Sequence, residues 1–164
     1  MAKTLVAKRD GRKEELDLEK LHKVVFWATN GVTGVSPSEV EIKSSIQFYN
    51  GISSSDIQET LIRAAAELIT EETPNYQYVA GRLINYHLRK QVYNDFEPCH
   101  VKQLVETNTD LGYYDPDLLG YYSDEEWDRI DSFVKHARDE DLTYVAMEQL
   151  RGKYLVQNRV TKQV

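Results

Sequence analysis

Basic side chains suited to binding an anion gather near the amino terminus of this sequence. The group consists of Lys8, Arg9, Arg12, Lys13 and Lys20, and a second pair, Arg89 and Lys90, follows far downstream. A triphosphate needs several cations that converge from different elements, because its charge is spread over many oxygens. Taken alone, the first group is equally typical of a solvated turn. The pattern therefore indicates an anion site only if the fold brings the two groups together.

Acceptor groups and the charge distribution point to the same part of the chain. Glu14 and residues 53–56 offer carboxyl and hydroxyl groups that could contact a base or a ribose. Residues 1–92 carry twelve basic and twelve acidic side chains, whereas residues 93–164 carry eight and fifteen, which accounts for the whole net charge of −7. An acidic region repels an anion. We therefore expect any phosphate site to lie before Tyr93, and we expect no nucleic-acid binding.

Enzymatic motifs are incomplete throughout the sequence. The phosphate-loop, dinucleotide-binding, zinc-protease and serine-hydrolase patterns are all missing. Four histidines, namely His22, His87, His100 and His136, show no metal-ligand spacing, so we expect no metal site. The single cysteine, Cys99, allows no internal disulfide, and nothing in its surroundings marks it as an activated thiol. We therefore expect no catalytic residues in this chain.

A small β-hairpin must position the first basic group. Short strand-like runs, residues 5–8 and 13–16, flank a turn that contains Asp10-Gly11, a dipeptide typical of tight hairpins. A helix is predicted to start after Asp17, which is a favourable N-cap residue, and to stop at Asn30-Gly31. Its inward side chains are predicted to be Leu18, Leu21, Val24, Val25 and Ala28.

Three further helices are predicted before Tyr93. Ser36-Pro37-Ser38-Glu39 has the pattern of a capping box with proline at the first helical position. Residues 53–56 offer several caps for a third helix, and Thr73-Pro74 is predicted to cap the fourth. The third helix should bury Ile57, Leu61, Ala64, Ala65 and Leu68, and the fourth should bury Tyr76, Val79, Ala80, Leu83, His87 and Leu88. The hairpin and these four helices predict a compact α+β unit over residues 1–93.

The remaining residues, 94–164, are predicted to be all-helical. Apolar side chains recur at helical spacing, and Ser123 and Glu126 have the spacing of a capping box. The predicted inward residues are Val101, Leu104, Val105, Trp127, Ile130, Phe133 and Val134. Residues 153–156 could form one more strand that pairs with a part of a larger protein, or they could be a poorly ordered tail. The fold class is thus α+β and mostly helical.

No run of the sequence approaches the roughly 20 apolar residues that a membrane span requires. The first residues are polar and lack the apolar stretch of a signal peptide. We therefore expect a cytoplasmic protein that does not contact a membrane.

Longer motifs resemble the ATP-cone domain of class I ribonucleotide reductase large subunits. They are residues 6–11 (VAKRDG), 18–21 (LEKL), 54–58 (SSDIQ), 64–66 (AAA), 74–80 (PNYQYVA), 87–90 (HLRK) and 96–98 (FEP). The resemblance runs from Leu5 to Val160, and residues 153–159 are similar to the segment that leads into the reductase barrel. ATP cones also occur in a zinc-ribbon repressor and in anaerobic reductases, but one cysteine cannot build the ribbon, and the last residues favour class I.

The resemblance implies an allosteric site that distinguishes ATP from dATP, with Mg as the accompanying ion. The implied nucleotide-binding residues are Lys8, Arg9, Glu14, Glu15, Leu16, Asp17, Lys20, Leu21, Ser54, Gln58, His87 and Lys90. Lys8, Arg9 and Lys90 would face the phosphates, aided by the dipole of the first helix. His87 lies on an apolar stripe, so a binding role and a core role both stay open.

Two positions depart from the commonest pattern of the family. Gln58 stands where the best-known members have histidine, and Ser54 stands where they have threonine. Serine keeps the hydroxyl, whereas glutamine cannot become cationic. The departure puts inhibition by dATP in doubt more than ATP binding.

The family reduces ribonucleoside diphosphates for deoxyribonucleotide synthesis, with barrel cysteines and a radical from a small di-iron subunit. The barrel cysteines are absent from this sequence. By the resemblance, the partners would be the remainder of the large subunit and the di-iron subunit, and the chain would be a fragment, a truncated product or one piece of a split large subunit. Three readings stay open: a regulatory module, a split-enzyme subunit that gains activity with its companion, or a remnant without function.

Overall fold

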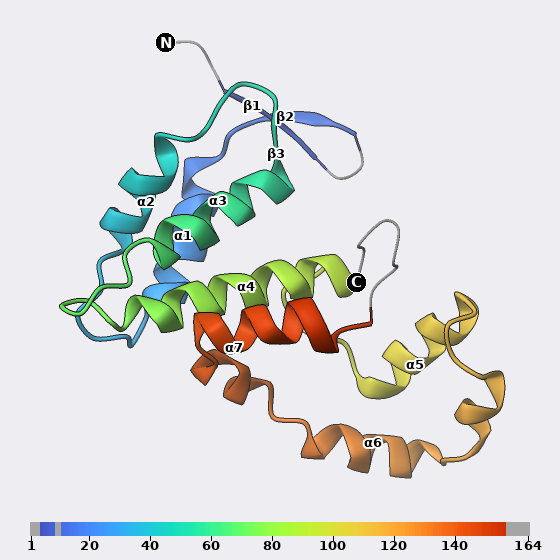
Figure 1. Cartoon of the computed structure of the whole chain (residues 1–164). Helices are drawn as coiled ribbons and strands as arrows, with labels where there is room; N and C mark the ends of the chain where they lie inside the picture. Colours follow the sequence, from blue (N-terminus) through green and yellow to red (C-terminus); the bar gives the residue numbers. More distant parts are fainter. Residues whose placement is uncertain (1–3, 9–10, 157–164) are drawn as a thin grey trace.

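A small sheet lies at one end of the molecule, and the helices extend from it towards the other end (Figure 1). The computed structural model of the chain describes residues 4–8 and 11–156. The strands are β1 (Leu5–Ala7), β2 (Lys13–Glu15) and β3 (Ile52–Ser53). The α-helices are α1 (Leu18–Thr29), α2 (Pro37–Ser45), α3 (Ser54–Ala66), α4 (Tyr76–Val92), α5 (Val101–Asp110), α6 (Asp124–Phe133) and α7 (Tyr144–Gln149). Short helical turns, η1 (Pro116–Gly120), η2 (His136–Asp141) and η3 (Leu150–Tyr154), complete the described elements, so the mostly helical α+β prediction is confirmed.

The predicted hairpin is present, and a third strand extends it. β1 pairs antiparallel with β2, with Val6 opposite Glu14, and parallel with β3, with Val6 opposite Ile52. The sheet order is therefore β2-β1-β3, with β1 in the centre. β3 could not be predicted from the sequence, because a strand of two residues has no measurable periodicity. Burial of both Val6 and Ile52 holds the parallel pair in place.

Helix starts follow the predicted caps in some places and not in others. Asp17 accepts hydrogen bonds from the first turn of α1, and Ser123 and Glu126 form the predicted capping box of α6. The box predicted at Ser36 and Glu39 was wrong, because the Ser36 side chain makes no cap hydrogen bond and the Tyr76 hydroxyl donates to Glu39 instead.

The start of α4 also differs from the prediction. The helix begins after Asn75, not at Thr73-Pro74, and the Thr73 hydroxyl donates to the carbonyl of Leu68. The Asn75 amide donates to the Thr33 carbonyl, which joins this helix start to the loop before α2. Tertiary hydrogen bonds, which a local pattern cannot reveal, therefore decide where α4 begins.

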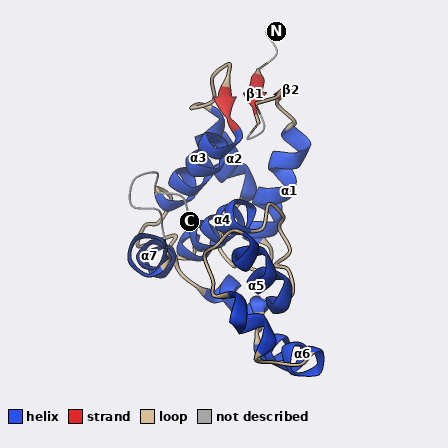
Figure 2. Ribbon diagram, turned by 90° about the vertical axis from the view of Figure 1, so that its right-hand side faces the viewer, coloured by secondary structure: helices blue, strands red, loops and turns tan. Residues whose placement is uncertain are grey.

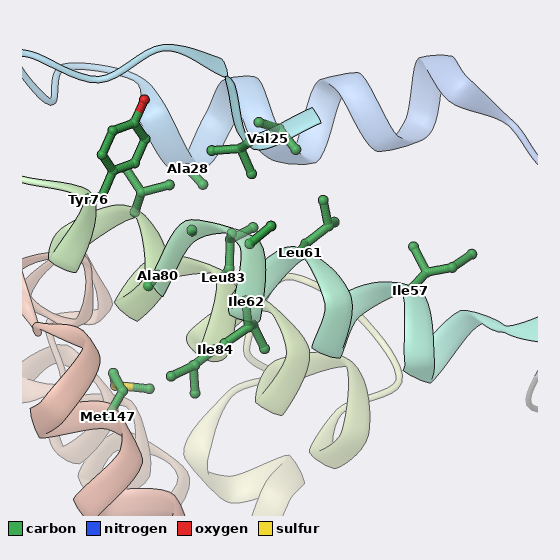
Figure 3. Packing of buried hydrophobic residues seen from close by; sticks show 14 of the residues in the cluster. Val25, Ala28, Ile57, Leu61, Ile62, Tyr76, Ala80, Leu83, Ile84 and Met147 are labelled. Atoms are coloured by element: carbon green, nitrogen blue, oxygen red, sulfur yellow. The ribbon is translucent and has the colours of Figure 1, made fainter. Parts of the chain in front are cut away.

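The core lies between α1, α3 and α4 (Figure 3). All six side chains predicted to be buried on α4 are buried, as are Ile57, Leu61, Ala64 and Ala65 on α3. Three predictions were wrong: Leu18 at the start of α1 is 64% exposed, and Phe133 and Val134 at the end of α6 are 72% and 42% exposed. All three lie at helix ends, Leu18 as the first residue of α1, Phe133 as the last residue of α6 and Val134 as its C-cap.

The later helices divide into two groups. Met147 of α7 belongs to the same core as α3 and α4, and α7 lies alongside α4 in Figure 1. By contrast, α6 lies at the end of the molecule opposite the sheet, with Trp127 as its buried residue (Figure 2). The acidic region therefore lies largely away from the sheet.

Residues 153–156 do not form the strand that their composition suggested. Residues 150–154 form a π-helical turn that continues α7, and the amide of Leu155 donates to the carbonyl of Leu150. Residues 157–159 of the motif that resembles the segment leading into the barrel lie outside the described residues. Among the described helices, none combines the length and the apolar character that crossing a bilayer would demand.

Gly81 provides a test of the packing between α4 and the segment before α7. A Cβ atom at this position would collide with the carbonyl oxygen of Leu142 and approach the carbonyl carbon of Thr143 to 3.0 Å. Because both are backbone atoms, they cannot move aside as a side chain does. We expect Gly81→Ala to lower the free energy of unfolding by about 2 kcal/mol, as overpacking does. Thermal unfolding followed by circular dichroism measures the effect. Gly120→Ala, where the added Cβ meets no atom within 4 Å, is the control and should shift Tm little.

Candidate functional site

A cleft of about 520 Å³ opens where the sheet meets the first turns of α1 and α3 and the last turns of α4. Its volume lies within the range of small-molecule sites. The lining side chains that carry charge or polar groups are Lys8, Arg12, Glu14, Glu15, Asp17, Lys20, Ser54, Gln58, Tyr86, Lys90 and Asn94. Val6, Leu16, Leu21, Val24 and Ile57 supply the apolar part of the wall.

The cleft brings together the two basic groups that are far apart in the sequence. Lys8 and Arg12 come from the hairpin, Lys20 from α1 and Lys90 from the end of α4. All of the residues implied by the resemblance line this cleft except two. Arg9 lies outside the described residues, and His87 faces elsewhere.

Each of three lysines in the cleft faces a nearby carboxylate. The Nζ atom of Lys8 lies 3.1 Å from Glu14 Oε2, that of Lys20 lies 3.6 Å from Asp17 Oδ2, and that of Lys90 lies 3.9 Å from Asp95 Oδ1. These pairs are partly exposed and therefore contribute little to folding stability. An anionic ligand can replace the carboxylates as the partner of the lysines at small cost.

Asp17 also shapes the amino-terminal end of α1. One carboxylate oxygen accepts hydrogen bonds from the amides of Glu19 and Lys20, at 3.0 and 3.1 Å. The hydrogen bond from the Lys20 amide lowers the pKa of Asp17, and the charge of Lys20 adds to the effect. Two first-turn amides are thereby occupied, so the lysine side chains are the more accessible donors for an anion.

The start of α3 presents polar groups on the other side of the cleft. Ser53 caps the helix by accepting a hydrogen bond from the Asp56 amide. Ser54 and Gln58 are one turn apart, so both reach the cleft from the same face. The Oε1 atom of Gln58 is buried and has no hydrogen-bond partner among the described residues. A buried acceptor without a partner is costly, and a ligand hydroxyl or amine would satisfy it.

An aromatic cluster supports the wall formed by α4. The ring of Tyr86 lies 6.2 Å from that of Trp27 and 5.5 Å from that of Phe96, centroid to centroid. Tyr86, together with Asn94 just beyond α4, is a lining residue that the sequence analysis did not single out. The four-residue spacing from Tyr86 to Lys90 is the signal that could have found it, because such residues share a helix face.

His87 belongs to the core side of α4. The residue is 1% exposed, and its Nε2 atom lies 3.4 Å from Glu59 Oε1. It is not among the residues that line the cleft. Of the two roles left open for His87, this position favours the core role.

Metal binding and nucleophilic chemistry find little support among the described residues. Within residues 4–8 and 11–156, no cluster of three His, Cys, Asp or Glu side chains is arranged to hold a metal ion. Burial raises the pKa of the Cys99 thiol, which is the opposite of what an activated nucleophile requires.

Comparison with known proteins identifies the family. The family model described as the ATP cone domain matches residues 4–91. The chain is 51% identical to the ribonucleoside-diphosphate reductase 1 subunit alpha of Salmonella typhimurium and 50% identical to that of Escherichia coli, each over 98% of this chain and 21% of the relative. It is 41% identical to the ribonucleoside-diphosphate reductase subunit alpha of Enterobacteria phage T4, over 97% of this chain and 21% of the relative.

The chain thus spans about a fifth of the length of the curated relatives that it matches. The match to the family model includes every described element that lines the cleft, from β1 to nearly the end of α4. The chain belongs to the ATP-cone family.

Proposed function

We propose that this chain is the allosteric nucleotide-binding region of a class I ribonucleoside-diphosphate reductase large subunit, and that its cleft binds ATP or dATP. The observation that carries the proposal is the convergence of lysines from the hairpin, α1 and α4 on one cleft that also contains the unpartnered Oε1 atom of Gln58. Cations from separate elements suit a triphosphate, and a buried acceptor suits a ribose hydroxyl or an exocyclic amine.

The phosphates occupy the side of the cleft that Lys8, Lys20 and Lys90 line. A triphosphate replaces Glu14, Asp17 and Asp95 as the partner of these lysines. A bound Mg ion balances part of the charge of the nucleotide, and Arg9 adds a further cation. The base and ribose then face Ser54, Gln58 and the apolar wall.

In this proposal the chain is one part of a larger reductase. Residues 1–93 act as the regulatory domain, and residues 94–164 act as a helical segment that connects it to the reductase barrel. The partners are the remainder of the large subunit and the small radical-generating di-iron subunit, in the cytoplasm. Catalysis belongs to those parts, because the chain has a single cysteine.

ATP should stabilise the isolated chain against heat, because a ligand that binds only the folded state shifts the unfolding equilibrium by mass action. At about 100 times the dissociation constant the gain approaches about 2.7 kcal/mol. Lys8→Ala and Lys90→Ala should each remove most of this gain, because each deletes a phosphate partner. Differential scanning fluorimetry with and without Mg-ATP measures the shift in Tm.

The control for this experiment is Lys102→Ala on α5, since Lys102 pairs with Asp124 and Glu106 and does not line the cleft. Its response to ATP should equal that of the unchanged chain. An ATP response that persists in full in both cleft variants would show that the nucleotide binds elsewhere.

Discrimination between ATP and dATP should depend on Gln58. The two nucleotides differ by one hydroxyl, so a site separates them through polar groups that are paired with one and unpaired with the other. The glutamine amide cannot reproduce the geometry or charge of the histidine found in well-known members of the family. We expect dATP to bind, with a smaller difference between the two affinities than in the Gln58→His variant. Calorimetric titration of both nucleotides into both proteins measures this, and equal affinity ratios would contradict it.

The purified chain alone should not reduce ribonucleotides, because the single cysteine cannot supply the set of thiols that the reaction needs. An assay for deoxyribonucleoside diphosphate formation, with ribonucleoside diphosphate and a thiol reductant, tests this expectation. Product formed without added subunits would contradict it. Product formed only after a companion barrel chain is added would identify a split enzyme.

A further inference from the structure

One carboxylate in this structure connects three elements that are distant in the sequence. The Oε1 atom of Glu59 on α3 lies 2.7 Å from Nη1 of Arg151 in η3 and 3.4 Å from Nε2 of His87 on α4. Glu59 and Arg151 are 92 residues apart. His87 is almost fully buried, with a side chain 2% exposed, whereas the side chains of Arg151 and Glu59 are 24% and 39% exposed. Solvent therefore partly screens the ion pair between Glu59 and Arg151.

Arg151 also contacts α7, the helix that precedes its own turn η3. Its Nη2 atom donates to Glu148 Oε1 of α7 at 2.7 Å, so the planar guanidinium bridges one carboxylate of α3 and one of α7. The bridge lies in the π-helical turn η3, and π-helical turns are rare and frequently occur at functional sites. The contact with Glu59 thus ties α3 to the segment that follows α7, and the contact with Glu148 holds the guanidinium against α7.

The same two helices that hold Glu59 and His87 also line the cleft. Glu59 directly follows Gln58 on α3, and His87 lies between Tyr86 and Lys90 on α4. α3 and α4 pack against each other along the core. A change in the relative position of their cleft ends therefore also moves the Glu59 carboxylate relative to His87 and Arg151, because a helix transmits displacement along its length.

We propose that Glu59 and Arg151 form a positioning latch that couples nucleotide binding in the cleft to the conformation of the α7–η3 segment. The latch rests on the function proposed above. A nucleotide that contacts both Lys90 of α4 and Gln58 of α3 fixes these two helices relative to each other. The Glu59 carboxylate is then held within hydrogen-bonding distance of Arg151. Because coupling between two sites is reciprocal, a closed latch also strengthens nucleotide binding.

The first test follows the latch in the unchanged chain and in one variant. Hydrogen–deuterium exchange of the intact 164-residue chain, with and without Mg-ATP, reports on the amides of residues 150–155. We expect ATP to slow their exchange, including that of the Leu155 amide bonded to Leu150. In Arg151→Gln the same amides should exchange at a rate that ATP does not change. ATP also slows exchange through global unfolding at all protected amides. The latch therefore predicts slowing at residues 150–155 that Arg151→Gln removes while the slowing in the core helices α3 and α4 remains.

The second test measures the reciprocal effect by calorimetric titration of Mg-ATP. Arg151→Gln and Glu59→Gln should each weaken binding about fivefold, the lower end of typical coupling between sites. The double variant should bind no more weakly than either single variant, because the two residues act through one contact. Lys102→Gln is the matched control, since it removes a cation from an ion pair of similar length between α5 and α6 and should leave the affinity unchanged.

The outcomes separate the latch from the proposed function. ATP that binds the unchanged chain in a Lys8-dependent manner, with equal affinity in the Arg151 and Glu59 variants and no change in exchange at residues 150–155, would overturn the latch alone. An unchanged chain that does not bind ATP would overturn the proposed function and the latch together. Circular dichroism of each variant establishes that it is folded, and the exchange result on the unchanged chain needs no variant.

Discussion

The parallel pairing of β1 with β3 is the constraint on which the cleft depends. It sets Val6 opposite Ile52 and Ala7 opposite Ser53, so that the chain leaving β1 at Lys8 and the chain entering α3 at Ser54 are neighbours. Neither residue is near the other in sequence, and a hairpin alone would leave α3 unattached to the sheet. Burial of Val6 and Ile52 stabilises the pairing, because two ladder positions contribute few hydrogen bonds. The cleft thus has its first two walls because two short strands share one buried contact.

The helical framework was largely predictable, because its signals are local. Asp17 and Ser123 cap the helices they were expected to cap, and the apolar stripe of α4 is buried along its length. The errors arise where a distant residue competes for a local partner. Glu39 has the spacing of a capping residue, yet it accepts a hydrogen bond from Tyr76, whose ring is fully buried between these elements. Residues 153–156 have the composition of a strand, but the described residues show no neighbouring strand there, and the chain continues as a helical turn.

The lysines that line the cleft were among the predicted site residues, whereas some residues of its walls were not. The sequence spacing of Lys8, Lys20 and Lys90 does not indicate that they lie close together, and this expectation rested on the family resemblance. Tyr86 could have been found from the sequence, because its four-residue spacing to Lys90 places both on one helix face. His87 shows the opposite difficulty, since a histidine on an apolar stripe can face a ligand or the core. Its contact with Glu59 of α3 is a tertiary contact, which the sequence pattern of α4 cannot predict.

The ion pairs of the cleft bear on which anions it can hold. Lys8, Lys20 and Lys90 each face a carboxylate, so a ligand gains only the difference between its own interaction and the one it replaces. A small anion that meets one lysine gains little, because partly exposed pairs are nearly balanced by solvation. A triphosphate meets several lysines with groups that are already joined, so the loss of translational freedom occurs once and the favourable contacts add. Paired lysines in an open cleft therefore favour a polyanion over a single phosphate, even though each pair taken separately is weak.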